Sequence, residues 1–346
     1  MGPRRASRSG GIGWSAPPAL LAAGCLLLAG AASACGSARP QAAAAQSSSS
    51  PAAAPPASQT GGFDGQRAWV HLQKLVGFGP RPPDTENIRR TQQYIASELQ
   101  SFGCAVKQDD FHAQAPVGAL AMKNIIAQAP GKSSDILLLL THYDTLRLPG
   151  FVGADDGGSS TALMLELARV LCAHPQPLAV WIGFVDGEED QTNFATAQQA
   201  QTVWSDEDST YGSRELAAQM ALSGDLKRVK AVLLADMIGD ANLDIVRDTN
   251  SAPWLVDLVW STAQRLGYGG YFLSSSMPVD DDHMPFVRRG VPSVDVIDFD
   301  YPPWHTADDT LDKCSPHSLA VVGHVFLESV RALGQKFAPV TRRAGR

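Results

Sequence analysis

The chain has 346 residues, of which 44% are hydrophobic and 18% are charged, as in ordinary globular proteins, so it has room for one large α/β domain or two smaller ones. The formal net charge is −7, and residues 1–62 hold four arginines and no acidic residue, so the remaining chain is the acidic part. Because nucleic-acid binding requires clustered basic residues and no basic stripe is present, this composition argues against that function.

Residues 1–35 have the pattern of an export signal. A basic region, a short apolar region and a small-residue cleavage site follow one another, namely Arg4, Arg5 and Arg8, residues 19–32, and Ala32-Ser33-Ala34. Cys35 directly follows this site, as in bacterial lipoproteins, whose mature N-terminal cysteine is acylated. We therefore expect an exported protein, either a lipoprotein of the bacterial cell envelope or a periplasmic or secreted protein.

Residues 36–62 consist largely of Ala, Pro, Ser and Gln and contain no large apolar side chain. Such a segment cannot bury a core, which predicts a disordered linker and a single catalytic domain at residues 63–346. Cys104, Cys172 and Cys314 lie in that domain. In an oxidising compartment one disulfide among them is compatible with the sequence, which does not define the pairing.

Helical and strand patterns alternate along the domain. Helices are expected at residues 68–76, 85–102, 159–172, 254–266 and 315–333 and from about residue 211, and strands at 104–112, 121–128, 136–140, 178–185, 229–234 and 293–297. Several of these strands are apolar without alternation, which is typical of parallel strands covered on both faces. The order predicts an α/β protein with a mixed, mostly parallel central sheet sandwiched by helices.

Side chains that bind metals follow each of the four predicted core strands. They are His142 and Asp144, Glu188 and Glu189, Asp236, and His305, with Asp155 and Asp156 at a helix start. A lone acidic pair is more often a solvated loop, but the carboxyl ends of parallel strands meet at one edge, where α/β proteins bind ligands. Imidazole and carboxylate ligands without a thiolate favour a catalytic zinc ion.

Other acidic residues have less specific interpretations. Three acidic residues are expected to orient the candidate histidine ligands through hydrogen bonds, namely Asp144, Asp155 and Asp308. A further set is treated as surface or loop acids, namely Asp240, Asp244, Asp298 and Asp300.

The metal-type residues resemble those of the M28 zinc aminopeptidase superfamily. The shared motifs are His-Tyr-Asp, Ala-Asp-Asp, Gly-Glu-Glu, a single Asp, and Trp-His-Thr-x-Asp-Asp, spread over roughly residues 66 to 335. The resemblance implies the zinc aminopeptidase fold, which is phosphorylase/hydrolase-like. In the two-zinc peptidases of the superfamily, Glu188 matches the general base, and the matching ligands are His142, Asp156, Glu189, Asp236 and His305.

Longer segments are similar to the glutaminyl-peptide cyclotransferases, or glutaminyl cyclases. These segments are Asp186-Gly187-Glu188-Glu189, Trp204-Ser205, Tyr211-Gly212-Ser213-Arg214, Asp281-Asp282-His283 and Trp304-His305-Thr306. The resemblance implies one zinc ion held by Asp156, Glu189 and His305, with Glu188 as proton shuttle. It also implies a carboxylate network of Asp236 and Asp281, and a substrate pocket formed by Trp204, Trp304 and Val279.

The chemistry of such an enzyme matches these residue types. The α-amine of an N-terminal glutamine attacks its own side-chain amide and expels ammonia, so no activated water is needed. Zinc serves as a Lewis acid, and a carboxylate moves a proton from the amine to the departing nitrogen. We therefore predict an acyltransferase that forms pyroglutamate at the N-termini of peptides and proteins.

Two alternatives remain open. A two-zinc aminopeptidase would use His142 and Asp236 as ligands of a second metal ion and would hydrolyse N-terminal residues. A non-catalytic binding module on the same fold would be expected to lose Glu188 or a ligand, and none is lost. We expect a monomer without a nucleic-acid partner, with membrane contact only through a lipid on Cys35.

Overall fold

The structure is a computed structural model, and it describes residues 53–203, 205 and 207–338. The predicted export signal with Cys35, most of the predicted linker, and Trp204 lie outside the described residues. Residues 57–62 form turns, in which Thr60 is fully buried and its hydroxyl donates to the carbonyl of Phe63. The ordered domain therefore begins before residue 63, because this last part of the predicted linker packs and makes hydrogen bonds.

The central sheet has six strands in the order β1-β2-β4-β3-β5-β8. Their bounds are β1 Ala105–Ala115, β2 Gly118–Ala129, β3 Gly131–His142, β4 Gln176–Val185, β5 Val229–Asp236 and β8 Ser293–Ile297. The pairs β3·β4, β3·β5 and β5·β8 are parallel, and the β1–β2 hairpin adds to β4 in the antiparallel sense. The predicted fold class is confirmed.

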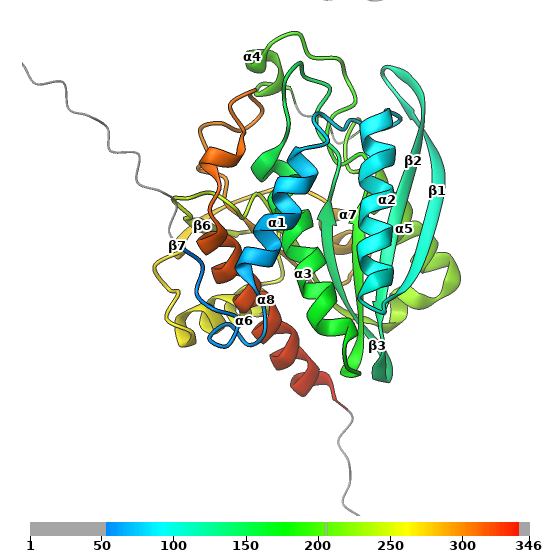
Figure 1. The fold of residues 1–346 in the computed structure, drawn as a ribbon. Coiled ribbons are helices and arrows are strands. Elements are labelled where there is room, and N and C mark those ends of the chain that lie inside the picture. The colour runs from blue at the N-terminus through cyan, green and yellow to red at the C-terminus, as the bar shows by residue number, and fades with distance from the viewer. Residues whose placement is uncertain (1–52, 204, 206, 339–346) are drawn as a thin grey trace, which may run out of the picture. The chain divides into compact units, whose positions relative to one another are not determined.

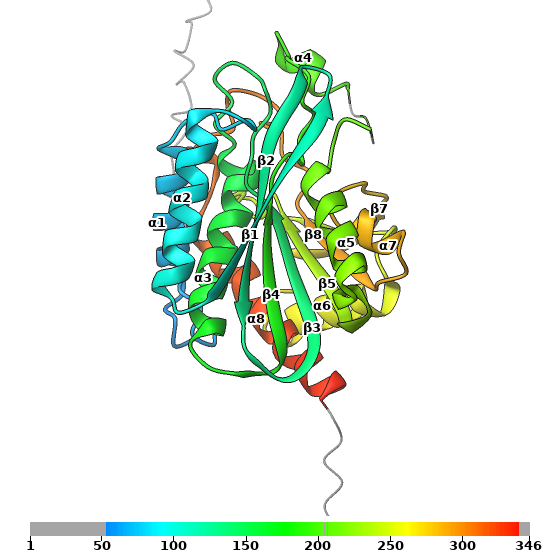
Figure 2. The same cartoon turned by 90° about the vertical axis from the view of Figure 1, so that its right-hand side faces the viewer.

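Helices cover both faces of this sheet, as Figure 2 shows for α1, α2 and α3 on one side and α5 and α7 on the other. The bounds are α1 Gly65–Val76, α2 Glu86–Ser101, α3 Ser160–Cys172, α5 Tyr211–Ser223, α6 Pro253–Arg265, α7 Met284–Val287 and α8 Pro316–Phe337. Leu137 and Leu139 pack into the core with α1, α3 and α8, whereas Leu138 and Leu140 face α5 and α7. Two buried faces explain why these strands are apolar without alternation.

One short α-helix and two short strands were not expected from the sequence, nor were the short 3-10 helices η2 (Asp225–Arg228) and η3 (Leu311–Lys313). The α-helix is α4 (Ala197–Ala200), and the strands form a two-stranded parallel sheet of β6 (Ile245–Asp248) and β7 (Phe272–Met277). These elements lie in connections between the main elements (Figure 1). They are too short to show a clear helical or strand periodicity of apolar residues in the sequence. No helix in the described part of the chain combines the length and apolar character needed to cross a membrane.

A disulfide joins the end of the α2–β1 connection to the last turn of α3. It links Cys104 to Cys172, whereas Cys314 is free and buried. Of the pairings that the sequence left open, the structure has this one. It closes a loop across a sequence separation of 68 residues.

Removing this disulfide should destabilise the fold. By the chain-entropy model, closing a loop of this length contributes about 4 kcal/mol to the free energy of unfolding. We expect the double variant C104S/C172S to unfold in less urea than wild type and to be insensitive to reductant. A wild-type unfolding midpoint unchanged by reductant would contradict the expectation.

Candidate metal centre and active site

Strand ends bring the predicted side chains to one edge of the sheet. His142 is the last residue of β3 and Asp236 the last residue of β5, while Glu188 and Glu189 follow β4. Between β4 and this pair, Gly187 has a φ of 72°, a left-handed conformation that favours glycine, and it turns the chain back over the edge. The site therefore forms where three neighbouring parallel strands end.

Asp156, Glu189 and His305 form the first group of candidate ligands, with their ligand atoms all within 4.8 Å of one another. His305 Nε2 lies 3.2 Å from Glu189 Oε2 and 3.6 Å from Asp156 Oδ2. Both oxygens are buried and lack a hydrogen-bond partner among the described residues. Burying such oxygens is costly unless a cation compensates, and two carboxylates with one imidazole are a donor set that suits zinc.

The orientation of the His305 ring is fixed from the other side. Its Nδ1 lies 2.9 Å from the carbonyl oxygen of Ala200, at the end of α4. Since a nitrogen bonding a carbonyl must carry a hydrogen, Nε2 is the nitrogen that has the lone pair when the ring is neutral. That lone pair faces the two carboxylates, as a metal ligand requires. Burial lowers the pKa of His305, but the charges of Glu189 and Asp156 outweigh it and raise this pKa to about 9, which shows how strongly the site attracts a positive charge.

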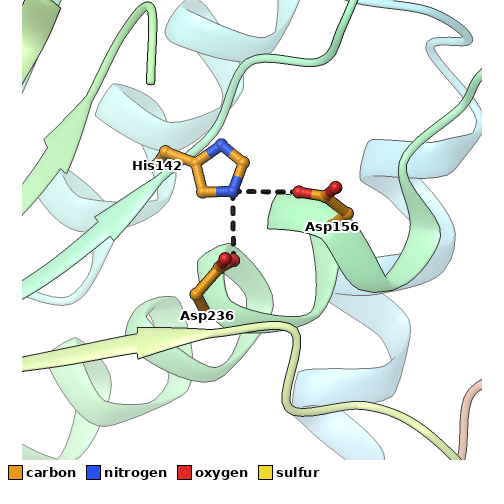
Figure 3. A group of neighbouring side chains, drawn as sticks. All are labelled: His142, Asp156 and Asp236. Atoms are coloured by element: carbon orange, nitrogen blue, oxygen red, sulfur yellow. Dashed lines mark hydrogen bonds and ion pairs between the residues drawn. The ribbon is translucent and has the colours of Figure 1, made fainter. Parts of the chain in front are cut away.

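The second group comprises His142, Asp156 and Asp236 (Figure 3). His142 Nε2 lies 3.0 Å from Asp236 Oδ1 and 3.3 Å from Asp156 Oδ1. Asp156 therefore contributes one oxygen to each group and lies between them. On the far side of the ring, His142 Nδ1 lies 3.4 Å from Asp144 Oδ1, so Asp144 stands where the sequence placed an orienting carboxylate.

A buried carboxylate supports the backbone of Asp156. Asp309 accepts hydrogen bonds from the backbone N–H of Asp155 and Asp156, at 2.8 and 3.2 Å, and from the hydroxyl of Tyr301 at 2.7 Å. The sequence assigned a supporting role to Asp308, but that side chain is exposed. The prediction was wrong by one residue, because the pattern of the loop does not show which of two adjacent aspartates points inward.

Glu188 lies beside both groups and is 5% exposed. Its backbone N–H donates to Asp144 Oδ1 at 3.1 Å, and its Oε2 lies 3.9 Å from His142 Nδ1. Burial raises the pKa of Glu188 well above its usual value, His142 acts in the opposite direction, and Asp281 raises it further. A carboxyl of this kind can hold a proton near neutral pH and release it again.

Further carboxyls lie around Glu188. Burial raises the pKa of Asp281 well above its usual value, and the charge of Asp295 adds most to this shift. Asp236 likewise has a pKa raised by burial. Burial and mutual repulsion therefore disfavour the ionisation of all these carboxyls at once.

A pocket of about 240 Å³ opens onto these residues. Its apolar wall is formed by Met237, Met277, Val279, Ile297, Phe299 and Trp304, and its acidic side includes Asp156, Glu188, Asp236 and Asp281. The Trp304 ring stacks on His305 with centroids 3.9 Å apart. A larger groove of about 490 Å³ lies between α2 and the β1–β2 hairpin, and no predicted site residue lines it.

The structure therefore gathers all but one of the predicted site residues, and their roles stay predictions. Trp204 lies outside the described residues, while Val279 and Trp304 line the pocket. Asp295 was not predicted from the sequence. It could have been noticed as a charged residue within the apolar strand β8. Ala200 was not predicted either, because its backbone carbonyl leaves no mark in a sequence.

Two of the predicted surface acids are buried instead. Asp298 is 0% exposed and Asp240 is 6% exposed. Asp298 Oδ2 accepts the backbone N–H of Asp244 at 2.9 Å, while its Oδ1 has no partner among the described residues. Asp298 was assigned to the surface because an acidic residue just after a strand is usually solvated, but here it forms hydrogen bonds with Met237 and Asp244 of the loop after β5 and is buried.

Comparisons with known proteins agree with this geometry. Residues 124–330 match the model of peptidase family M28. A glutaminyl-peptide cyclotransferase of Drosophila melanogaster is 31% identical over 291 residues, which cover 74% of this chain and 79% of that protein. The crystal structure of an Acidobacteriales bacterium glutaminyl cyclase is 41% identical, with a TM-score of 0.73, covering 79% of this chain and 96% of its own.

A peptidase is also among the similar structures. A Zn-dependent exopeptidase of Parabacteroides distasonis is 28% identical with a TM-score of 0.71, covering 78% of this chain and 98% of its own. Cyclases and exopeptidases thus share this fold, so the activity has to be argued from the pocket as well.

Asp298 should make stability depend on pH. Burial raises its pKa to about 8, whereas an unfolded aspartate titrates near pH 4. Between these values the folded state holds a proton that the unfolded state lacks, so the free energy of unfolding falls as pH rises. D298N keeps the hydrogen bonds without titrating, so its stability relative to wild type should increase from about pH 5 to pH 8.

Urea unfolding at several pH values measures this difference. The matched control is D300N, which changes an exposed aspartate two residues away and should follow the wild-type curve. Parallel pH dependences of D298N and wild type would show that Asp298 is ionised in the folded protein.

Proposed function

Because the chain belongs to the glutaminyl-peptide cyclotransferases of peptidase family M28, we propose that it converts the N-terminal glutamine of peptides and proteins to pyroglutamate and releases ammonia. One observation carries the proposal, namely that a single pocket is lined by Asp156 and His305 of the first ligand group, by the buried carboxyl of Glu188 and by an apolar wall ending in Trp304. Such a pocket accepts a short side chain and limits water, which matters because hydrolysis to glutamate is the competing reaction.

The metal is proposed to be one zinc ion, held by Asp156, Glu189 and His305. Support comes from the unpartnered buried oxygens of Asp156 and Glu189 beside the His305 lone pair. Zinc bound there supplies a Lewis acid for the side-chain amide oxygen of the substrate.

Glu188 is proposed to move the proton. As the α-amine nitrogen forms its bond to the side-chain carbonyl carbon, the amine gives up a proton to the Glu188 carboxylate. Glu188 then delivers that proton to the departing side-chain nitrogen, the carbon–nitrogen bond breaks and ammonia leaves, so the protons balance. Burial raises the pKa of Glu188, and the charge of Asp281 raises it further, which favours both transfers.

An aminopeptidase of the same family is the second candidate, favoured by the complete group of His142, Asp156 and Asp236. It would need a second zinc ion and an attacking water. The two candidates therefore differ in metal content and in product.

Replacing Glu188 with Gln should reduce ammonia release from glutaminyl peptides by about 10²–10⁴-fold, because the proton transfer is lost. The zinc content measured by elemental analysis should stay unchanged, since Glu188 is not a proposed ligand. E86Q, on the exposed surface of α2, serves as the matched control. A wild-type protein that carries a second zinc ion and releases free N-terminal residues would contradict the cyclase and favour the aminopeptidase.

The protein is further proposed to act in the bacterial cell envelope, as a monomer tethered through acylated Cys35. The proposal is supported by the basic, apolar and small-residue pattern of residues 1–35 and by the Cys104–Cys172 disulfide, which is typical of oxidising compartments. Fatty-acid labelling should mark the wild type in the membrane fraction and not the C35S variant. An unlabelled wild-type protein in the cytoplasmic fraction would contradict this location.

A further inference from the structure

Arg81 is a fully buried arginine in the loop between α1 and α2, with 1% of its surface exposed. Its Nε donates to the carbonyl of Tyr143 at 2.8 Å, its Nη2 donates to that of Gly153 at 2.8 Å, and its Nη1 donates to that of Val152. Its backbone N–H donates to the hydroxyl of Thr145 at 2.9 Å. One residue thus holds both ends of the loop that runs from β3 to the candidate ligand turn.

These anchor points are next to candidate ligands. Tyr143 directly follows His142, and Gly153 precedes the turn Ala154–Ser159, which contains Asp156. Gly153 has a φ of 53°, and a Cβ there would lie 2.1 Å from the carbonyl oxygen of Asp156, so this tight turn requires glycine. Holding the carbonyls of Val152 and Gly153 therefore helps to fix where the Asp156 carboxylate points.

The backbone around Arg81 is restricted on both sides. Pro80 precedes it and Pro82 follows it, and a residue before proline is confined to extended conformations. The guanidinium is planar and presents its donors in a fixed fork, so it can bridge carbonyls from separate segments. Side chain and backbone are both suited to holding one geometry.

The positive charge of Arg81 also interacts with the carboxylates of the site. All its side-chain hydrogen bonds end on backbone carbonyls, so the charge is compensated at longer range. Burial lowers the pKa of Arg81 to about 10, and the surrounding Asp309, Asp144, Asp156 and Glu189 act against that shift. The guanidinium is therefore charged at neutral pH, and its charge acts on two candidate zinc ligands, Asp156 and Glu189.

We propose that Arg81 is a positioning residue of the metal centre, which aligns the Asp156 turn with the end of β3 and offsets the negative charge of the ligand carboxylates. It touches neither substrate nor metal in this role. The inference rests on the proposed zinc site. It adds Arg81, from the loop between α1 and α2, to the residues that determine the geometry of that site.

Two variants separate geometry from charge. R81K keeps a positive charge but loses the fork, and R81M removes both. Residues that support metal ligands typically change metal affinity about 10–100-fold, so we expect R81K to bind zinc about 10-fold more weakly than wild type and R81M more weakly still. The dissociation constant is measured by competition with a zinc chelator, and excess zinc should restore ammonia release in R81K.

The control is R169K. Arg169 lies in the last turn of α3, and its guanidinium donates hydrogen bonds to the carbonyl of Gly62 and to the side chain of Glu166. R169K should lower the melting temperature of the zinc-free protein without changing zinc affinity. If R81K and R81M lowered that melting temperature but bound zinc like wild type, Arg81 would be a core residue only and the inference would be overturned.

The zinc titration is independent of the catalytic assay. A wild-type protein that binds zinc but does not cyclise glutamine would contradict the proposed function, while the titration would still decide the role of Arg81. A wild-type protein without zinc affinity would overturn both.

Discussion

Buried negative charge at the carboxyl edge of the sheet is the constraint on which the rest of the structure depends. Carboxyl groups from β4, β5 and the turn before α3 converge in a region shielded from water, where uncompensated charges are costly. Each carboxyl is compensated in its own way. Asp236 faces the His142 ring, Asp309 accepts backbone N–H groups, and burial raises the pKa values of Glu188 and Asp281 well above their usual range.

Asp156 and Glu189 each have an oxygen without a hydrogen-bond partner among the described residues, and these two oxygens lie next to Nε2 of His305. The proposed zinc ion would supply positive charge in this arrangement, and the buried guanidinium of Arg81 supplies a fixed positive charge close to Asp156 and Glu189. Backbone strain accompanies the site, since Met237 and His305 have φ values of 45° and 54°, which are unfavourable for residues other than glycine. Both residues line the pocket, so the strain lies where geometry matters for function.

The sequence predicted the sheet and the site because their signals are local. Aliphatic runs marked the buried strands, and polar residues at the strand ends marked the edge where they meet. The features it did not predict depend on three-dimensional packing. Asp309 rather than Asp308 turns inward, Asp298 is covered by a loop, and the disulfide partner of Cys104 depends on how α3 docks. The hydrogen bond from His305 to Ala200 involves a backbone carbonyl, which no residue type reveals.

In the proposed reaction, the attacking nucleophile belongs to the substrate and is not a water molecule. Mass spectrometry of a glutaminyl peptide incubated with the zinc-loaded protein tests this claim most directly. We expect a product that has lost only the mass of ammonia and whose N-terminus no longer reacts with amine reagents. A product shortened by its first residue, or one that carries glutamate in place of glutamine, would contradict the account.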